Sequence, residues 1–518
     1  MTVMEGNSFQ PTDQTWFGHP KGVFLIALTE FWERFSYYGM LGLLVLFLTA
    51  PIAKGGFGWD SKPAILLFGF YSGLAFATPL FGAWLANNYL GERLCIAIGG
   101  ILLALGHLLL TGPHAIPDLI SLFVGFDVNT IFEAADIRLG ALTINEQGAQ
   151  ILHDVLKEQG VASGFFAISL TYTLVSGCFY LGLFLIIIGT ALIKPTISSI
   201  VSRLYPDSSA TRDAGFAIFF MFIYIGSISA NLIAGFLGEK IGWVYGFGAA
   251  GAGMIFGITL YLLKQNAYLG DLGKTPSRPP DGPRKALTRQ ERERLYAIAL
   301  QGLFTVIYAA AFYQKGGLLT LFARDDLDRT AFGFTVPVTW LLIISTSVFV
   351  ALAPASGRLW KYLDQRGMNP SAAIKLAIAL GLMTTAYVLM SGAGLQAKSS
   401  GTASLLWMVL TYMLFGLADL LVWPIQISLV SKLAPQRYTA LCIGGWYLTV
   451  GLGTWLSGVI AVSLENLDHF TSFLVLSALT GVSAALLLVL SPLLKRLSHG
   501  GEGEPNSLKD DKDEPAIT

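Results

Sequence analysis

Long apolar runs separated by short polar segments fill most of the chain. A helix needs about 20 mostly apolar residues to cross a lipid bilayer, so the pattern predicts twelve transmembrane helices. A polar segment at 264–295 divides them into two six-helix halves, at 22–263 and 296–495. The predicted spans are 22–49, 63–87, 93–112, 171–203, 213–238, 243–263, 296–323, 336–360, 371–392, 402–433, 438–463 and 469–495.

Charged residues outside these runs predict the orientation. Lys and Arg are enriched on the side of the N-terminus, so residues 1–21, the linker 264–295 and the tail 496–518 are expected to be cytoplasmic, in an inner-membrane protein. The first half of the linker has the composition of a flexible chain, and its charged second half predicts a helix at the membrane surface. The tail is predicted to be disordered. Residues 113–165 form an extended periplasmic insertion, either short helices over the mouth or a passive insertion.

Composition narrows the possible functions. Hydrophobic residues make up 54% of the chain and charged residues 13%, about half the usual share in soluble domains. The 33 basic and 33 acidic residues balance, which argues against nucleic acid as a partner. Cys95, Cys178 and Cys442 lie in separate apolar runs, which predicts neither a disulfide framework nor a zinc site. Without GxSxG, HExxH or GxxxxGK[ST] motifs, neither an enzyme nor an ATP-driven pump is expected.

Two segments in the two halves match each other. Residues 194–206 and 423–435 share Pro, Ser, Val, Ser, Leu and Pro at a constant offset of 229 residues. Parallel six-helix repeats around a midplane site are typical of the major facilitator fold, which is the fold predicted for this chain. Pro195 and Pro424 each remove a helical hydrogen bond and predict a bend. The paired bends suit a rocking gate, or they reflect shared ancestry alone.

The first span carries charge inside an apolar helix. Glu30, Glu33, Arg34, Tyr37 and Tyr38 recur at helical spacing and form one polar stripe. Ionisable groups inside a span cost about 2.5–3.5 kcal/mol each, so the stripe is expected to face the bundle interior or a wet cavity. Two carboxylates beside one guanidinium leave one negative charge, which a proton can neutralise. A proton carrier and a static buried ion network both fit this spacing.

Two further charges lie in the repeat-related spans. Lys194 precedes Pro195 in the fourth span, and Asp419 lies five residues before Pro424 in the tenth. Because these spans are equivalent in the repeat, the opposite charges predict a gate pair that forms and breaks across the interface of the halves. The alternative is two snorkelling side chains that pair locally.

The run from Glu30 to Gly39, which reads ExxERFxYYG, resembles the signature of the proton-dependent oligopeptide transporter family. The resemblance covers nearly the whole membrane region, including 78–91, 179–195 and 332–340. It implies a major facilitator bundle and symport of di- and tripeptides with protons by alternating access. It also implies a monomer, with protons as the coupling ion and with no cofactor.

The resemblance further implies roles for single residues. The proton-coupling cluster would be Glu30, Glu33 and Arg34. Lys194 and Arg34 would attract the peptide carboxylate, whereas Asp419, at the position of a family Glu, would receive the amino group and form the gate pair with Lys194. The substrate-binding residues implied by the family or by its altered pocket positions are Arg34, Tyr37, Tyr38, Lys194, Tyr224, Tyr313, Ser345, Asp419, Trp423 and Trp446.

The pocket departs from the family pattern at several positions. Leu41 and Tyr313 replace two charges that serve the family as an outer gate pair, so that gate is expected to close by packing. Bulky Tyr224, Tyr313 and Trp423 predict a smaller or more aromatic cavity. These departures leave the substrate open. The alternative function is a divergent member that carries another small charged or amphipathic solute with protons, and a third is a receptor or inactive scaffold on the same fold.

Overall fold

A computed structural model describes residues 15–135, 138–139, 146–158, 160–161, 164–205, 210–276, 287–435 and 438–499. Contacts along the chain divide it into two compact units. Unit 1 comprises Met1–Pro280, Lys315–Asp325 and Arg329–Thr346. Unit 2 comprises Asp281–Gln314, Asp326–Asp328 and Ser347–Thr518.

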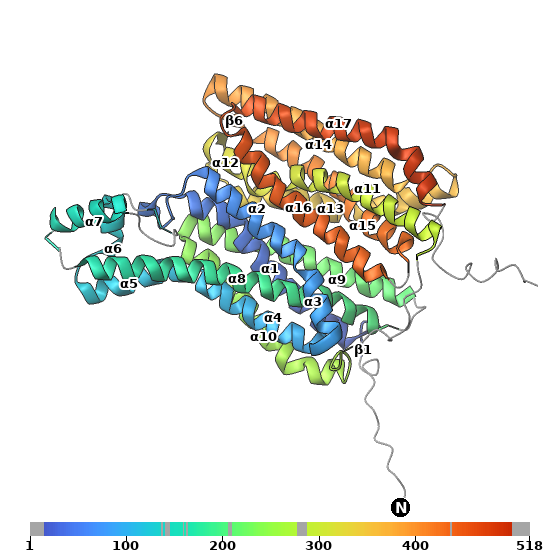
Figure 1. The fold of residues 1–518 in the computed structure, drawn as a ribbon, viewed down its shortest axis with the longest axis horizontal. Helices are drawn as coiled ribbons and strands as arrows, with labels where there is room; N and C mark the ends of the chain where they lie inside the picture. Colours follow the sequence, from blue (N-terminus) through green and yellow to red (C-terminus); the bar gives the residue numbers. More distant parts are fainter. Residues whose placement is uncertain are drawn as a thin grey trace, which may run out of the picture. The chain divides into compact units, whose positions relative to one another are not determined.

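Unit 1 is built from helices (Figure 1) and carries two short hairpins. Its helices are α1 (Lys21–Thr49), α2 (Ser61–Ala77), α3 (Pro79–Leu85), α4 (Glu92–Leu109), α5 (Gly112–Val124), α6 (Val128–Ala134), α7 (Glu146–Glu158), α8 (Phe165–Arg203), α9 (Ala210–Ser229), α10 (Trp243–Leu269) and α12 (Leu318–Asp325). π-Helical segments at Ala86–Leu90, Ala230–Ala234 and Leu237–Ile241 extend α3 and α9. The antiparallel hairpins pair β1 (Thr15–Trp16) with β2 (His19–Pro20) and β4 (Thr330–Ala331) with β5 (Phe334–Thr335).

Unit 2 is also helical. Its helices are α11 (Arg289–Phe312), α14 (Ala372–Ser400), α15 (Leu405–Leu433), α16 (Thr439–Leu464) and α17 (His469–Leu497). A short parallel ladder pairs β3 (Leu327–Asp328) with β6 (Ala403–Ser404). Two elements contribute residues to both units, namely the 3-10 turn Tyr313–Gly316 after α11 and helix α13 (Val338–Gln365).

The predicted spans are helices in the structure. Among the described residues, eleven helices or helix series are long and apolar enough to cross a membrane, or twelve if the bent pair α5–α6 counts as one span. The eleven correspond to the second to twelfth predicted spans. Helix α1 corresponds to the first; its 29 residues measure about 44 Å, enough to cross, but its charged stripe lowers its hydropathy.

Close backbone packing fixes the helix that carries Lys194. A Cβ atom on Gly99 of α4 would lie 2.8 Å from the carbonyl oxygen of Gly189 on α8. One on Gly106 would lie 2.7 Å from the carbonyl oxygen of Gly182. These distances leave no room for a side chain, so the two backbones meet directly, as small residues allow in membrane helices.

A polar clamp at the start of α4 fixes α8 and α10 as well. Glu92 and Arg93 are both buried there. Glu92 Oε2 pairs with Arg203 Nη1 of α8 at 2.7 Å. Arg93 donates to the Gly270 carbonyl oxygen at 2.6 Å and to Asn266 Oδ1 at 2.5 Å, at the end of α10. Helix α4 therefore joins its two neighbours through charged side chains at this end.

The structure differs from the sequence prediction in the second half of the linker. A separate surface helix was expected there, but α11 begins at Arg289 and continues to Phe312. Thr288 accepts a hydrogen bond from the Glu291 amide at 3.1 Å, and Glu291 accepts one from the Thr288 amide at 2.7 Å. This capping box starts the helix that becomes the seventh span, because it satisfies amides that a helix start leaves unpaired.

The insertion contains the short helices α5, α6 and α7, whereas their covering role stays a prediction. The repeat prolines Pro195 and Pro424 lie inside α8 and α15, as predicted. Several sequence expectations concern residues outside the described part of the chain. These are residues 1–14, Pro206 of the repeat, the Pro279-Pro280 step of the linker and the tail from residue 500.

Candidate functional site

The structure buries the polar stripe of α1. Glu30, Glu33, Arg34 and Tyr37 are each at most 5% exposed, and Tyr38 is half-buried. The rings of Tyr37 and Tyr38 contact each other edge to face with centroids 5.3 Å apart. The stripe is therefore buried inside the protein, as the cost of membrane-exposed charge predicts.

One guanidinium serves two carboxylates in this stripe. Arg34 Nε lies 2.7 Å from Glu30 Oε1 and 2.8 Å from Glu33 Oε2. The contact with Glu30 has hydrogen-bond geometry. Among the described residues, neither Glu33 oxygen has a hydrogen-bond partner, nor has Glu30 Oε2. Buried carboxylate oxygens normally find donors, so Glu33 is the less satisfied of the two acids.

Lys194 of α8 lies beside this ion cluster. Its Nζ atom is 4.1 Å from the centre of the Phe76 ring and 5.8 Å from that of Tyr37. Glu33 and Arg34 are near enough to interact with it electrostatically. Within the described part of the chain, this buried Nζ has no hydrogen-bond partner. A desolvated ammonium held over aromatic rings is suited to bind an incoming anion.

Two side chains next to the stripe were not predicted as part of the site. The Tyr71 hydroxyl of α2 is buried, has no hydrogen-bond partner among the described residues, and interacts electrostatically with Tyr37 and Glu33. His107 of α4 bonds the Leu103 carbonyl at 2.7 Å and the Ser36 carbonyl of α1 at 3.1 Å. A single tyrosine or histidine in an apolar span resembles ordinary packing, so the sequence held no signal for either.

The remaining predicted residues of unit 1 lie on other helices. Tyr224 is half-buried on α9, a helix that packs against α1. Ser345 of α13 is buried and donates to the Leu342 carbonyl at 3.1 Å, within its own helix. Substrate roles for both stay predictions.

Unit 2 brings its predicted site residues into aromatic surroundings. Tyr308 of α11 donates to Asp419 Oδ1 of α15 at 2.8 Å. The Tyr308 ring stacks on Phe312, which contacts Tyr313 with ring centres 5.5 Å apart. Tyr308 therefore connects Asp419 to the aromatic side chains. It was not predicted from the sequence, because it lies 111 residues from Asp419 along the chain.

Two tryptophans form a second aromatic contact in unit 2. The rings of Trp423 on α15 and Trp446 on α16 meet edge to face with centroids 5.1 Å apart. The buried Trp446 Nε1 has no hydrogen-bond partner among the described residues. An indole N–H left in this way is a donor that a ligand can use.

Two predictions concern residues in different units. Lys194 belongs to unit 1 and Asp419 to unit 2, so the gate pair stays a prediction. Leu41 and Tyr313, which replace the family's outer charges, are 9% and 8% exposed. Leu41 belongs to unit 1 and Tyr313 to unit 2. Closure by packing likewise stays a prediction. The described residues contain no group of three or more His, Cys, Asp or Glu side chains arranged to hold a metal ion.

Comparison with known proteins assigns the family. A family model described as the POT family matches residues 93–274 and 282–474. The chain belongs to the POT family. The peptide transporter YePEPT of Yersinia enterocolitica is 27% identical over 97% of this chain and 99% of its own length. A di-/tripeptide transporter of Lactococcus lactis is 27% identical over 93% of this chain and 98% of its own length.

Solved structures of POT family transporters share the fold. One in complex with a thioalcohol-conjugated peptide has a TM-score of 0.76 and 23% identity, over 94% of this chain and 98% of its own. Another, in complex with 5-aminolevulinic acid, has a TM-score of 0.76 and 23% identity, over 93% and 98%. The predicted fold, an all-α membrane protein of the major facilitator type, is confirmed. As a POT family member, the chain is a multi-pass membrane transporter and not an enzyme.

Proposed function

We propose that this protein is a secondary active transporter that takes up di- and tripeptides together with protons by alternating access. The observation that carries the proposal is the buried cluster of Glu30, Glu33 and Arg34 beside Lys194. Family membership and the peptide transporters among the relatives support it. Protons are the coupling ion, and no cofactor takes part.

Charge balance couples the proton to the substrate. With Glu30, Glu33, Arg34 and Lys194 all ionised, the cluster has no net charge. Protonation of one carboxyl gives it one positive charge, which a substrate carboxylate neutralises. Because an unbalanced buried charge is costly, each ligand favours binding of the other. Glu33 is the proton acceptor, since neither of its oxygens has a hydrogen-bond partner among the described residues, whereas Glu30 Oε1 accepts one from Arg34.

The two ends of a peptide fit the two kinds of site. Arg34 and Lys194 attract the carboxylate, while Tyr37 and Tyr38 contact the backbone. Asp419, held by Tyr308, receives the amino group. The aromatic side chains that surround the variable part of the peptide are Tyr224, Tyr313, Trp423 and Trp446, and Ser345 supplies a hydroxyl. Lys194 and Asp419 form the gate pair once the peptide has left.

The protein resides in the inner membrane as a monomer with both termini in the cytoplasm. The enrichment of Lys and Arg in the segments on the side of the N-terminus supports this orientation. One proton that moves down roughly 150 mV provides about 3.5 kcal/mol. That amount supports a concentration ratio of a few hundred.

A second candidate substrate is a small amino acid-like zwitterion. A structural relative holds 5-aminolevulinic acid, which has a carboxylate and an amino group but is no peptide. The bulky Tyr224, Tyr313 and Trp423 favour such a compact ligand. Uptake of 5-aminolevulinic acid without any competition by dialanine would favour this candidate.

The test uses purified protein in liposomes with an imposed proton gradient. Dialanine is expected to accumulate and to acidify the lumen, and both effects should vanish in Glu33→Gln. Counterflow exchange of labelled dialanine should persist in that variant, because exchange needs no net proton movement. Loss of exchange as well would assign Glu33 a structural role.

A further inference from the structure

Two hairpins of unit 1 share an unusual turn. β1–β2 turns through Phe17 and Gly18, and β4–β5 turns through Phe332 and Gly333. Both residues of each turn have positive φ, at 49° and 79° in the first and 50° and 77° in the second, as in type I′ turns. Asn, Asp or Gly suits the first position of such a turn, whereas Phe strains the backbone there. The Phe17 ring meets that of Phe24 edge to face with centroids 6.2 Å apart, but Phe17 is still 94% exposed, and Phe332 is fully exposed. Contacts within the protein therefore explain little of the choice of Phe.

Each hairpin places a lysine over an aromatic ring at its base. Lys21 Nζ lies 5.3 Å from the centre of the Trp16 ring. Lys240 Nζ lies 5.3 Å from the centre of the Phe334 ring. Aromatic rings combined with lysine are typical of the zone where a bilayer meets water, because rings settle at headgroup level while the ammonium reaches into water.

The hairpins lie at opposite ends of α10. Trp16 contacts Tyr268 near the end of α10, with ring centroids 6.1 Å apart. Lys240, which contacts the other hairpin, comes three residues before α10 begins at Trp243. The 27 residues of α10 measure about 40 Å. That length matches the roughly 40–45 Å between the two headgroup regions of a bilayer.

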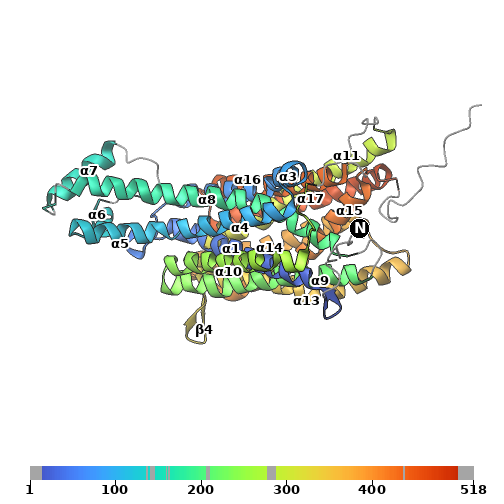
Figure 2. The same ribbon diagram turned by 90° about the horizontal axis from the view of Figure 1, so that it is seen from below.

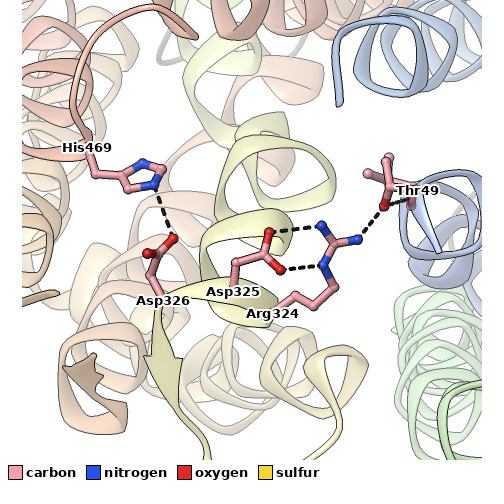
Figure 3. Close-up of polar contacts among 6 residues, drawn as sticks. Thr49, Arg324, Asp325, Asp326 and His469 are labelled. Atoms are coloured by element: carbon pink, nitrogen blue, oxygen red, sulfur yellow. Dashed lines mark hydrogen bonds and ion pairs between the residues drawn. The ribbon is translucent and has the colours of Figure 1, made fainter. Parts of the chain in front are cut away.

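Polar contacts next to the β4–β5 hairpin mark the edge of the apolar zone. At the end of α12, Arg324 donates to Thr49 of α1 and to both carboxylate oxygens of Asp325, at 2.7 and 2.8 Å (Figure 3). Within unit 2, the next residue, Asp326, pairs with His469 at 3.1 Å (Figure 3). Figure 2 shows the hairpin labelled β4 extending sideways from α10, across the helix direction.

We propose that the two hairpins anchor unit 1 to the two lipid interfaces. Phe17 and Phe332 insert into the headgroup zones of opposite leaflets, and Lys21 and Lys240 face the lipid phosphates. Burial in lipid offsets the backbone strain of the two turns. The anchors hold unit 1 at a constant depth, and this role is independent of which solute the protein carries.

Asparagine provides the decisive substitution. In Phe332→Asn the new residue suits the positive φ, so the hairpin is kept, while the apolar ring is lost. A spin label at Thr335→Cys reports depth, and one at Gln150→Cys, an exposed residue of α7, is the control. Both labels are made in a background in which Cys95, Cys178 and Cys442 are replaced, in liposomes of phosphatidylethanolamine and phosphatidylglycerol.

Oxygen is concentrated in lipid, whereas a nickel chelate stays in water. The label at residue 335 is therefore expected to collide more often with oxygen than with the chelate, and the control label at residue 150 is expected to collide more often with the chelate. Phe332→Asn should shift the label at 335 to the aqueous pattern, and Phe332→Trp should restore the lipid pattern. A label at 335 that is as accessible to the chelate as the control, with Phe332 in place, would overturn the proposal.

Stability in two environments separates lipid burial from packing within the protein. Phe17→Asn and Phe332→Asn are expected to lower Tm by a few degrees in lipid nanodiscs and to leave it unchanged or raised in detergent. An equal loss in both environments would mean that the rings pack on protein, which would contradict the anchor role.

Discussion

The ion cluster of unit 1 and the acidic site of unit 2 differ in how their carboxylates are paired. In unit 1, Arg34 is shared by Glu30 and Glu33 at 2.7 and 2.8 Å, and Lys194 adds a second positive charge nearby. In unit 2, Asp419 accepts a hydrogen bond from Tyr308 at 2.8 Å within an aromatic cluster.

The difference suggests a division of labour. Four interacting charges can change their total by one proton at modest cost, because each protonation state keeps at least one ion pair. A carboxylate that accepts a hydrogen bond from a tyrosine hydroxyl, as Asp419 does, suits recognition of a cation. We infer that unit 1 couples the proton and unit 2 recognises the amino group of the substrate.

The largest expected effect comes from Glu33→Gln in unit 1. Loss of the proton acceptor should reduce the accumulation ratio from as much as a few hundred to about one, because the proton gradient no longer drives uptake. Uptake of labelled dialanine into liposomes under an imposed gradient measures the ratio. Glu30→Gln is the matched control and should keep part of the gradient-driven uptake, since Arg34 already satisfies one Glu30 oxygen.

Lys194→Met tests whether the buried ammonium of Lys194 binds the substrate carboxylate. Hydrogen bonds to charged groups contribute about 1.5–3 kcal/mol, so the Kd of dialanine should rise by roughly 10- to 100-fold. Binding to the purified protein measures it. Phe76→Leu, which keeps the charge and removes the ring beneath it, should have a smaller effect. An unchanged Kd in Lys194→Met would remove this residue from the binding site.

Asp419→Asn tests recognition of the amino group in unit 2. The unmodified protein should bind dialanine more tightly than N-acetyl-dialanine. In the variant the ratio of the two affinities should fall by about tenfold, since a charged hydrogen bond becomes a neutral one. Competition for labelled substrate measures it. Tyr308→Phe, which removes only the hydroxyl that donates to Asp419, should lower the preference for dialanine by about fivefold or less. Equal losses for both peptides would argue against this role.

The smallest effect concerns a solvated carboxylate of unit 2. Asp468 caps α17, and hydrogen bonds from Thr471 and Lys398 lower its pKa from 3.8 to about 2. A lowered pKa stabilises the fold above pH 3.8, and this contribution is lost as the pH falls towards 2. The Tm difference between the unmodified protein and Asp468→Asn should therefore narrow between pH 4 and pH 2, whereas transport at neutral pH stays unchanged. A constant difference would contradict the assigned pKa.

The sequence predicted the parts of the site that lie within one helix. The stripe of α1 follows from helical spacing and the cost of charge in lipid, and the structure confirms its burial. Lys194 was predicted to pair with Asp419 or to pair locally. Its approach to Glu33 was not predicted, because it depends on packing between α1 and α8 that spacing along the chain does not encode. Tyr71 and Tyr308 were missed for the same reason.

The fold followed from length, hydropathy and the internal repeat, whereas the helix ends were predicted only approximately. The Thr288–Glu291 capping box is legible in the sequence and explains why α11 begins where the linker was expected to form a separate helix. The Phe-Gly turns read as hairpin signals only once their strands are known, because two-residue strands are too short to leave a pattern of alternation.

Infrared difference spectroscopy tests the central claim most directly. Dialanine added to the protein in lipid near neutral pH should produce a change in the band of a protonated carboxyl group, and Glu33→Gln should remove that change while Glu30→Gln retains it. A spectrum in which the carboxyl groups stay ionised throughout, with and without dialanine, would contradict the proposed coupling of proton and substrate.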